Sequence, residues 1–145
     1  MAEREVMLVR RWFEEVWNQR RVEAMDELLA ADARVYGLGA GNDVVIGPAG
    51  FRPAYEQLLG AFPDIHFTVE DAISVGDLVA LRWTARATHT GDHLGVPATG
   101  ETVTITGMVF ARAQDGKMVE GWNNWDMLGL MHATGQVPGP KIVGQ

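Results

Sequence analysis

The sequence predicts an α+β domain in which helices come first and a curved antiparallel sheet follows, the two together forming a cone-shaped α+β barrel. Two observations predict this class. Apolar residues recur at three-and-four spacing from Arg4 to Asn18, as in a helix with one buried stripe. Long β-rich runs joined by turn signals then follow from His66 onward. Because long strands in a twisted sheet tend to curl, we expect the sheet and the helices to enclose a pocket.

Helical patterns indicate three helices in the first half of the chain. The first spans Arg4 to Asn18, and acidic residues stand at its amino end, where the helix dipole favours them. A shorter helix follows from Val22 to Ala30. The third begins at Gly47-Pro48, because proline is accepted in the first turn of a helix, and it ends at Pro63.

A glycine-rich segment, residues 37–42, lies between two short predicted strands, Val35-Tyr36 and Asp43–Ile46. A phosphate-binding loop needs a helix that opens directly after it, whereas another strand follows here. We therefore interpret the segment as a hairpin loop rather than as a dinucleotide site.

Four long strands are expected in the second half of the chain. Their predicted positions are His66–Val75, Leu78–Thr90, Glu101–Ala113 and a run that starts after Lys117. Strict alternation in the first of them places one set of side chains on a single face. That set is Phe67, Val69, Asp71, Ile73 and Val75.

Asp115-Gly116 joins the last two strands and is a strong signal for a tight hairpin, since this dipeptide accepts the positive φ angles of the turn. Counting by twos from the turn puts Trp122, Asn124 and Asp126 on one face of the final strand. Arg112 and Glu120 flank the turn on opposing strands and are expected to form a cross-strand pair.

Composition narrows the class of protein. The 145 residues fit one domain, expected at 1–135 and followed by a C-terminal tail at 136–145. A net charge of −7 argues against nucleic acid as a partner, because such binding relies on Lys and Arg. The absence of cysteine fits a cytoplasmic location, and no window of the sequence predicts a membrane span.

Two further absences narrow the chemistry. Ser74 is the sole serine and no nucleophile-elbow motif surrounds it, so a serine nucleophile is not expected. Lys117 and Lys141 are the two lysines, and they stand at a turn and in the tail, which argues against a Schiff-base lysine. Catalysis then falls to carboxylates, histidines, tyrosines and tryptophans.

Asp126 is the candidate catalytic acid/base. With Trp122 on its own strand face and little hydration, its pKa would rise toward neutral pH, where proton transfer in both directions is efficient. Asn124 shares this face and is a candidate donor to a substrate carbonyl, or alternatively a partner for backbone at the sheet edge. The structural alternative for Asp126 is a helix N-cap, because a short apolar run follows it directly.

His89 ends a long strand and is a second catalytic candidate, as a proton-transfer partner of Asp126. A loop-anchoring histidine is the alternative. A metal site from His89, Asp92 and His93 is conceivable from composition, but Gly91 breaks any helix that would align them, and we predict no metal.

Aromatic side chains are expected to form a flat substrate pocket, and at least two of the candidate tryptophans should contact it. The predicted substrate-binding residues are Trp122, Asn124, Trp83, Trp12, Trp17, Tyr36, Phe51, Tyr55 and Met108.

A series of motifs runs in order from about residue 5 to residue 135: Phe62-Pro63-Asp64, Gly76-Asp77, Arg82-Trp83-Thr84, Thr88-His89-Thr90-Gly91, Gly95–Gly100, Asp115–Glu120, Trp122, Asp126 and Gly129-Leu130. With these motifs the chain resembles the SnoaL-like polyketide cyclases and ester cyclases of the nuclear transport factor 2-like superfamily. The resemblance implies a cone-shaped cavity lined by the sheet and the first helix, no cofactor, a hydrophobic small-molecule substrate, and a homodimer or homotetramer. It also implies that Asp126 serves as acid/base in an intramolecular aldol closure.

Other functions remain open at this point. An epoxide hydrolase of this fold would need two carboxylates bridged by an arginine, for which Glu70, Arg82 and Asp126 are the candidates, provided that Arg82 faces inward. Hydroxylases and isomerases use the same fold. A non-catalytic module that holds a small ligand belongs to a different class of function.

Overall fold

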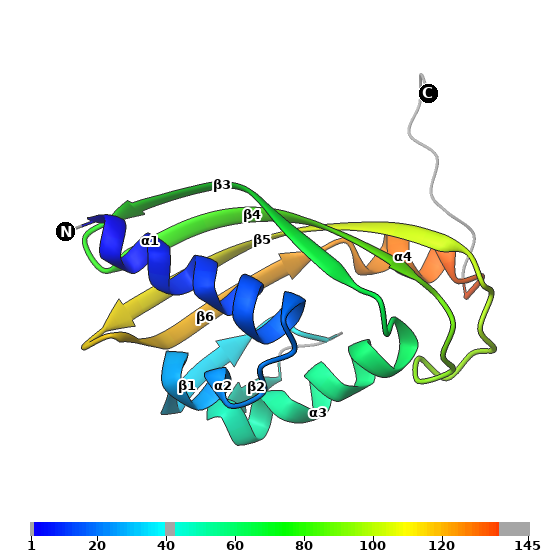
Figure 1. The fold of residues 1–145 in the computed structure, drawn as a ribbon, viewed down its shortest axis with the longest axis horizontal. Coiled ribbons are helices and arrows are strands. Elements are labelled where there is room, and N and C mark those ends of the chain that lie inside the picture. Colours follow the sequence, from blue (N-terminus) through cyan, green and yellow to red (C-terminus); the bar gives the residue numbers. More distant parts are fainter. Residues whose placement is uncertain (1, 40–42, 137–145) are drawn as a thin grey trace.

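The computed structural model describes residues 2–39 and 43–136, and Figure 1 shows their arrangement. The predicted tail therefore lies outside the described residues, except for Gln136. The elements in chain order are α1 (Ala2–Arg11), η1 (Trp12–Asn18), α2 (Ala24–Leu28), β1 (Leu29–Tyr36), β2 (Val44–Ile46), α3 (Gly47–Ala61), β3 (His66–Val75), β4 (Leu78–Thr88), β5 (Thr102–Gln114), β6 (Lys117–Trp125) and α4 (Met127–Ala133).

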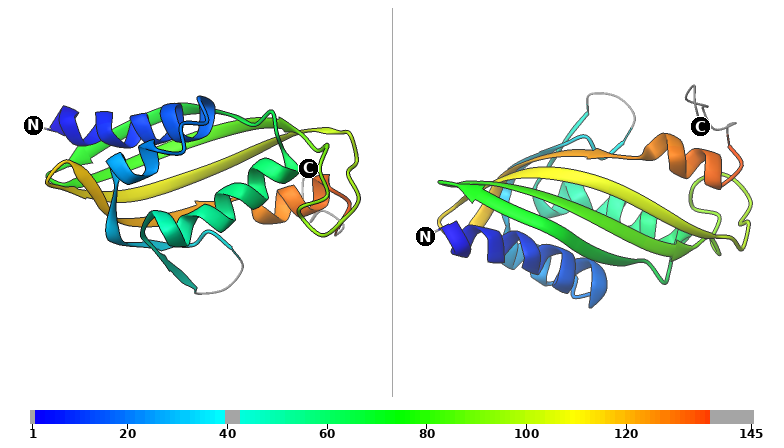
Figure 2. Two further views of the ribbon diagram at one scale, coloured as in Figure 1. Left: turned by 60° about the horizontal axis from the view of Figure 1, so that its bottom comes forward. Right: turned by 90° about the horizontal axis from the view of Figure 1, so that it is seen from above.

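The described strands form one six-stranded sheet in the order β2-β1-β6-β5-β4-β3. This arrangement of a curved sheet and helices confirms the predicted α+β class (Figure 2). The four long strands pair antiparallel as predicted, and β1 adds a parallel pairing with β6 that the sequence did not predict. Two parallel strands need a long crossover connection. Here the connection from β1 to β6 comprises β2, α3, β3, β4 and β5.

The hairpin between β5 and β6 forms at the predicted dipeptide. Asp115 and Gly116 adopt φ angles of 54° and 78°, as a tight hairpin turn requires. The resulting register pairs Val109 with Asn123 and Gly107 with Trp125. Arg112 and Glu120 are also partners, with 3.5 Å between Nε and Oε1. The predicted turn and cross-strand pair are both confirmed.

The first helix is not one continuous α-helix, as the spacing had suggested, but changes to a π-helix at Trp12. The wider turn brings side chains five positions apart to the same side. Trp12 and Trp17 consequently both meet the ring of Phe51 on α3 edge-on, at centroid distances of 5.0 and 6.0 Å. The π-helix thus places two tryptophans together in the interior.

The core lies between the helices and one face of the sheet, which we call the inner face. It carries the buried, apolar positions of β5, whose side chains alternate between buried and exposed along most of the strand. The opposite, outer face carries the exposed positions. The inner residues of β5 are Val103, Ile105, Gly107, Val109, Ala111 and Ala113.

The predicted alternation of β3 fails at one point. The pairing with β4 shifts between Val69 and Asp71, which is a β-bulge. Because an extra residue reverses the facing of every later side chain, Phe67 is buried whereas Ile73 and Val75 are 68% and 81% exposed. The predicted single face is therefore split between the two sides of the sheet.

Asp64 links the end of α3 to the end of β4. Its carboxylate accepts hydrogen bonds of 2.7 Å from both the backbone N–H and the hydroxyl of Thr88. These bonds hold the pKa of Asp64 below its ordinary value of 3.8.

We expect the stabilisation from Asp64 to be lost in acid. A lowered pKa in the folded state stabilises the protein above the ordinary value, and that stability disappears as the pH falls through the folded pKa. The difference in unfolding free energy between wild type and Asp64→Asn, measured with urea, should be larger at about pH 6 than at about pH 3. An equal difference at both pH values would contradict this role.

Candidate functional site

The inner face of the sheet, η1, α3 and α4 enclose a cavity of about 450 Å³, which we call the inner cavity. Its size lies in the range typical of small-molecule sites. The lining comes from elements far apart in the sequence. Its main residues are Trp12, Phe13, Trp17, Phe51, Ala54, Gln57, Leu58, Phe67, Trp83, Ala85, Leu94, Ile105, Asn123, Trp125, Met127, Leu130, Met131 and Gln136.

Among the residues that the structure describes, no charged side chain lines the inner cavity. Its polar side chains are the three amides of Gln57, Asn123 and Gln136, together with the indole groups. An ion placed there would lose its hydration without gaining an opposite charge, which is costly. The cavity is therefore suited to an uncharged, largely apolar ligand with flat rings.

Asn123 and Trp125 point inward from β6 and hold the end of β1. The Asn123 side-chain amide donates to the Tyr36 carbonyl at 3.0 Å, and Trp125 Nε1 donates to the Leu38 carbonyl at 3.2 Å. Gly37 makes this approach possible, because a Cβ atom there would lie 2.0 Å from the Asn123 carbonyl oxygen. Leu38 and Gly39, in the described part of the glycine-rich segment, also line the inner cavity.

Trp83 reaches the cavity by lying across Gly107 on the neighbouring strand. A Cβ atom at Gly107 would stand 2.3 Å from Trp83 Cζ2 and 3.0 Å from Trp125 Cβ. The bare backbone of Gly107 thus lets two indole side chains flank it on the inner face. Trp83 also contacts Phe67 edge-on, at a centroid distance of 4.9 Å.

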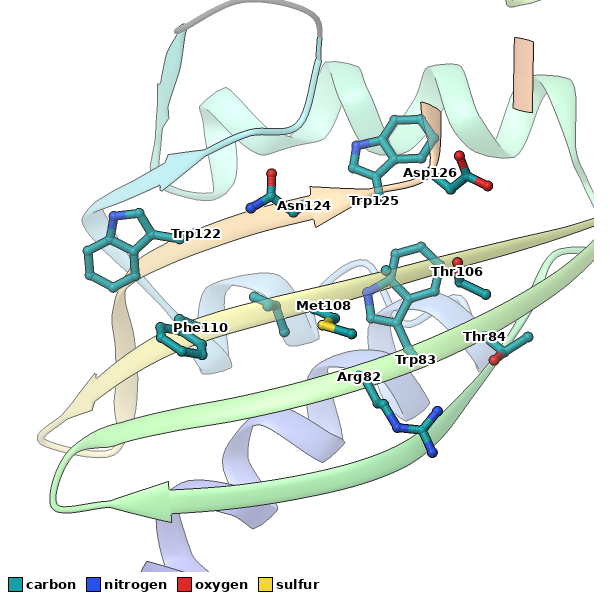
Figure 3. A pocket seen from close by; sticks show the side chains of 12 residues that line it. Arg82, Trp83, Thr84, Thr106, Met108, Phe110, Trp122, Asn124, Trp125 and Asp126 are labelled. Carbon is teal, nitrogen blue, oxygen red and sulfur yellow. The ribbon is translucent and has the colours of Figure 1, made fainter. Parts of the chain in front are cut away.

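A second hollow of about 540 Å³, the outer groove, lies on the opposite face of the sheet. Figure 3 shows its side chains, which come mainly from β4, β5 and β6. It brings together five residues that the sequence placed in one candidate site. They are Trp83, Met108, Trp122, Asn124 and Asp126.

The sequence-predicted residues are thus divided between two places. Trp12, Trp17 and Phe51 line the inner cavity, Trp122 and Asn124 lie on the outer face, and Trp83 lines both hollows. The sequence predicted correctly which side chains of β6 share a face. It placed the substrate pocket on the face that carries Asp126. The register with β5 identifies the inward residue, because Val109 is buried and pairs with Asn123.

Asp126 is exposed and caps α4, so the expectation of a poorly hydrated carboxylate was wrong. Its Oδ1 accepts from the Gly129 N–H at 2.9 Å, which is the N-cap alternative. Its own N–H donates to the Thr106 carbonyl at 2.9 Å. A catalytic role for Asp126 remains a proposal and would have to operate from the outer groove.

His89 is completely buried and anchors the loop between β4 and β5. Its Nδ1 lies 3.3 Å from the Thr99 N–H nitrogen and 3.1 Å from the Thr99 hydroxyl oxygen, and its ring packs on Phe62. His89 lines neither hollow in the described part of the chain. Its Nε2 has no hydrogen-bond partner among the described residues. This is the loop-anchoring arrangement, with no contact to Asp126.

The two tyrosines predicted to bind substrate lie outside both hollows. Tyr36 stacks on Trp122 at a centroid distance of 5.9 Å and so belongs to the outer face. The Tyr55 hydroxyl donates to the Val16 carbonyl at 2.9 Å, and burial raises the pKa of this phenol. Neither ring lines a hollow within the described residues, so substrate binding by Tyr36 and Tyr55 stays a prediction.

The epoxide hydrolase interpretation required Arg82 to face inward. Arg82 instead lies on the outer face, where its Nε is 2.6 Å from Asp71 Oδ2. Glu70 does not line the outer groove with Arg82 and Asp126. The three residues therefore do not form the required site.

No helix within residues 2–39 and 43–136 is long and apolar enough to cross a membrane. Histidine, aspartate and glutamate side chains form no cluster of three suited to a metal ion within the same ranges.

Comparison with known proteins identifies a family and similar solved structures for this chain. Residues 7–134 match the family model described as SnoaL-like polyketide cyclase. No curated protein sequence matches the chain. AclR, a candidate hydroxylase from Streptomyces galilaeus, is 29% identical with a TM-score of 0.85, over 99% of this chain and 88% of that one.

Two further solved structures are similar. IdmH, a candidate polyketide cyclase from Streptomyces antibioticus, is 29% identical with a TM-score of 0.77, over 90% of this chain and 98% of that one. A candidate SnoaL-like polyketide cyclase from Jannaschia sp. CCS1 is 24% identical with a TM-score of 0.84, over 94% and 95% of the two chains. These likenesses confirm the nuclear transport factor 2-like fold that the sequence predicted.

Proposed function

Because the chain belongs to the SnoaL-like polyketide cyclase family, we propose that it closes a ring in a flat, uncharged, carbonyl-rich small molecule bound in the inner cavity. The observation that carries this proposal is an aromatic cavity whose described lining holds no charged group. Such a site selects neutral ligands, because a buried ion would remain unpaired.

The inner cavity would act mainly by orientation. Holding two parts of one flexible chain in a reactive geometry removes much of the entropic barrier to ring closure. In the proposed step, the carbon of an enol attacks a ketone carbon of the same molecule and a C–C bond forms. The enol proton passes to the former ketone oxygen, so the step is an isomerisation that needs no external reactant.

A second candidate keeps Asp126 as the acid/base, acting in the outer groove. The observation that favours it is the presence of Asp126, Asn124 and Trp122 along that groove. The two candidates differ in which face of the sheet holds the substrate, and variants on each face distinguish them.

Filling the inner cavity should abolish ring closure. We expect Ala54→Trp, on the α3 wall, to reduce the rate of intramolecular aldol closure of an aryl ketone with an ortho 1,3-dicarbonyl side chain by at least about tenfold. Product formation is followed by chromatography. The matched control is Glu56→Trp, which places the same side chain at an exposed position of α3.

Asp126→Asn completes this test, because asparagine preserves the N-cap and removes the acid/base. The inner-cavity proposal expects this variant to retain activity. Loss of activity in Asp126→Asn together with full activity in Ala54→Trp would contradict the proposal and favour the outer groove.

We also propose that the chain forms a homodimer through the outer face. An apolar row crosses five strands there, through the pairs Ile73–Ala80, Ala80–Phe110, Phe110–Trp122 and Trp122–Tyr36. Phe110 is 53% exposed although β5 is a central strand. Exposed apolar patches of this kind are typical of interaction sites.

The charges around this row suit a second copy of the same chain. The ion pairs Arg82–Asp71 and Arg112–Glu120 lie on either side of the row, and each joins paired residues of two neighbouring strands. A face with paired charges avoids the repulsion that two copies with a net charge of −7 would otherwise meet. The apolar centre and charged border match the usual anatomy of an interface.

Phe110→Glu is therefore expected to convert the dimer into a monomer, since two copies would bring buried carboxylates together. Light scattering coupled to size-exclusion chromatography measures the mass. Thr104→Glu, an exposed outer position further along β5, is the control and should leave the mass unchanged. A wild-type protein that is monomeric at micromolar concentration would refute the dimer.

A further inference from the structure

We propose that the inner cavity recognises a hydroxyl group on its ligand, an enol or a phenol, through the side-chain oxygen of Asn123. This inference rests on the proposed binding function of the cavity. It adds the kind of polar group that the ligand carries and the residue that selects it.

The three amides of the cavity lining share one arrangement, in which the nitrogen is bonded to the protein. Gln57 Nε2 donates to the His93 carbonyl at 3.2 Å, and Asn123 Nδ2 donates to the Tyr36 carbonyl at 3.0 Å. Gln136 Nε2 donates to the Thr134 hydroxyl oxygen at 2.8 Å. In a planar amide the oxygen projects away from a partner of the nitrogen, so each oxygen is left for another donor.

The indole of Trp125 also has its donor engaged with the protein, because its single N–H donates to the Leu38 carbonyl at 3.2 Å. An indole has no second donor to offer. The wall formed by Asn123 and Trp125 on β6 therefore has its indole N–H and one of the two Asn123 amide N–H groups engaged with backbone carbonyls, and the Asn123 oxygen is left as an acceptor for a ligand.

Asn123 is the best placed of the three amides to select a ligand. Gln57 is exposed, whereas Asn123 is partly buried and its backbone is fixed by pairing with Val109 in the middle of the sheet. The orientation of its amide follows from its partner, since a carbonyl oxygen accepts only from the nitrogen side. Asn123 thus holds a hydrogen-bond acceptor at a fixed point of an otherwise apolar wall.

A ligand without a donor would leave the Asn123 oxygen unpaired on binding. Leaving a buried acceptor unpaired costs enough to weaken binding by about tenfold. An enol or phenol hydroxyl satisfies this oxygen, whereas a ketone or a methyl ether brings a second acceptor to it. In the proposed reaction the same contact would favour the enol form of the substrate, which is the nucleophile.

The test compares two probes of similar shape, 1-naphthol and 1-methoxynaphthalene, by calorimetry on the full chain. We expect 1-naphthol to bind wild type about tenfold more tightly. Asn123→Leu should remove this preference, and Asn124→Leu, the adjacent residue on the outer face, should retain it. Loss of the preference in Asn124→Leu alone would overturn the assignment to Asn123.

The possible outcomes separate this inference from the proposal on which it rests. Equal affinity of wild type for both probes would overturn the inference and leave an apolar binding cavity. Binding of neither probe would overturn the cavity function, and this inference with it. Because the comparison in wild type is decisive alone, poor folding of Asn123→Leu would not rescue a negative result.

Discussion

Replacing Gly37 with alanine is expected to lower the free energy of unfolding by about 3 kcal/mol. Gly37 has a φ of 81°, which disfavours residues with a Cβ atom, and that atom would lie 2.0 Å from the Asn123 carbonyl oxygen. The obstacle is backbone of a central strand, which cannot move aside. The end of β1 would therefore separate from β6, and the bond between Asn123 and the Tyr36 carbonyl would be lost.

Gly39→Ala is the matched control for this prediction, since nothing lies within 4 Å of a Cβ atom added there. Chemical denaturation of both variants measures the effect, and Gly39→Ala should remain close to wild type. If the two variants had the same stability, the close contact between Gly37 and Asn123 would not exist in solution.

Gly107→Ala is expected to reduce both stability, by about 2 kcal/mol, and the affinity of the inner cavity for 1-naphthol, by at least about tenfold. The new methyl group would occupy the space of the Trp83 ring, 2.3 Å from Cζ2. Trp83 would have to rotate, which changes the wall of the cavity. Calorimetric titration with 1-naphthol and denaturation in urea measure the two effects.

Gly121→Ala serves as the control for Gly107→Ala, because it introduces the same methyl group into β6 at a place where nothing lies within 4 Å. Both affinity and stability should be nearly unchanged in this control. Normal 1-naphthol affinity in Gly107→Ala would show that the Trp83 wall does not contribute to the site.

Much of the fold was predictable because its signals are local. Asp115-Gly116 determined the β5–β6 hairpin, and Pro48 and Pro63 bracketed α3. The β-bulge near Asp71 was not predictable, since one extra residue leaves the composition of a strand unchanged. The change to a π-helix at Trp12 was also missed, because the apolar spacing of this segment fits an α-helix as well.

The candidate site was predictable only in part. Trp12, Trp17 and Phe51 were expected in a pocket because apolar residues recur on one side of their helices, and they line the inner cavity. Asn123 and Gln57 were missed, because their roles depend on partners in other elements, at Tyr36 and His93. Asp126, a chemically suggestive carboxylate, directed attention to the outer face of β6, where it caps α4, and its catalytic role stays a prediction.

The measurement that tests the central claim most directly is an NMR titration of the five tryptophan indole N–H signals with 1-naphthol. Trp12 and Trp17 line the inner cavity and not the outer groove, Trp122 lines the outer groove and not the inner cavity, and Trp83 and Trp125 line both. The inner-cavity account predicts that the Trp12 and Trp17 signals shift together with one dissociation constant and that the Trp122 signal does not follow them. A shift centred on Trp122, with the signals of Trp12 and Trp17 unchanged, would contradict the account and place the ligand in the outer groove.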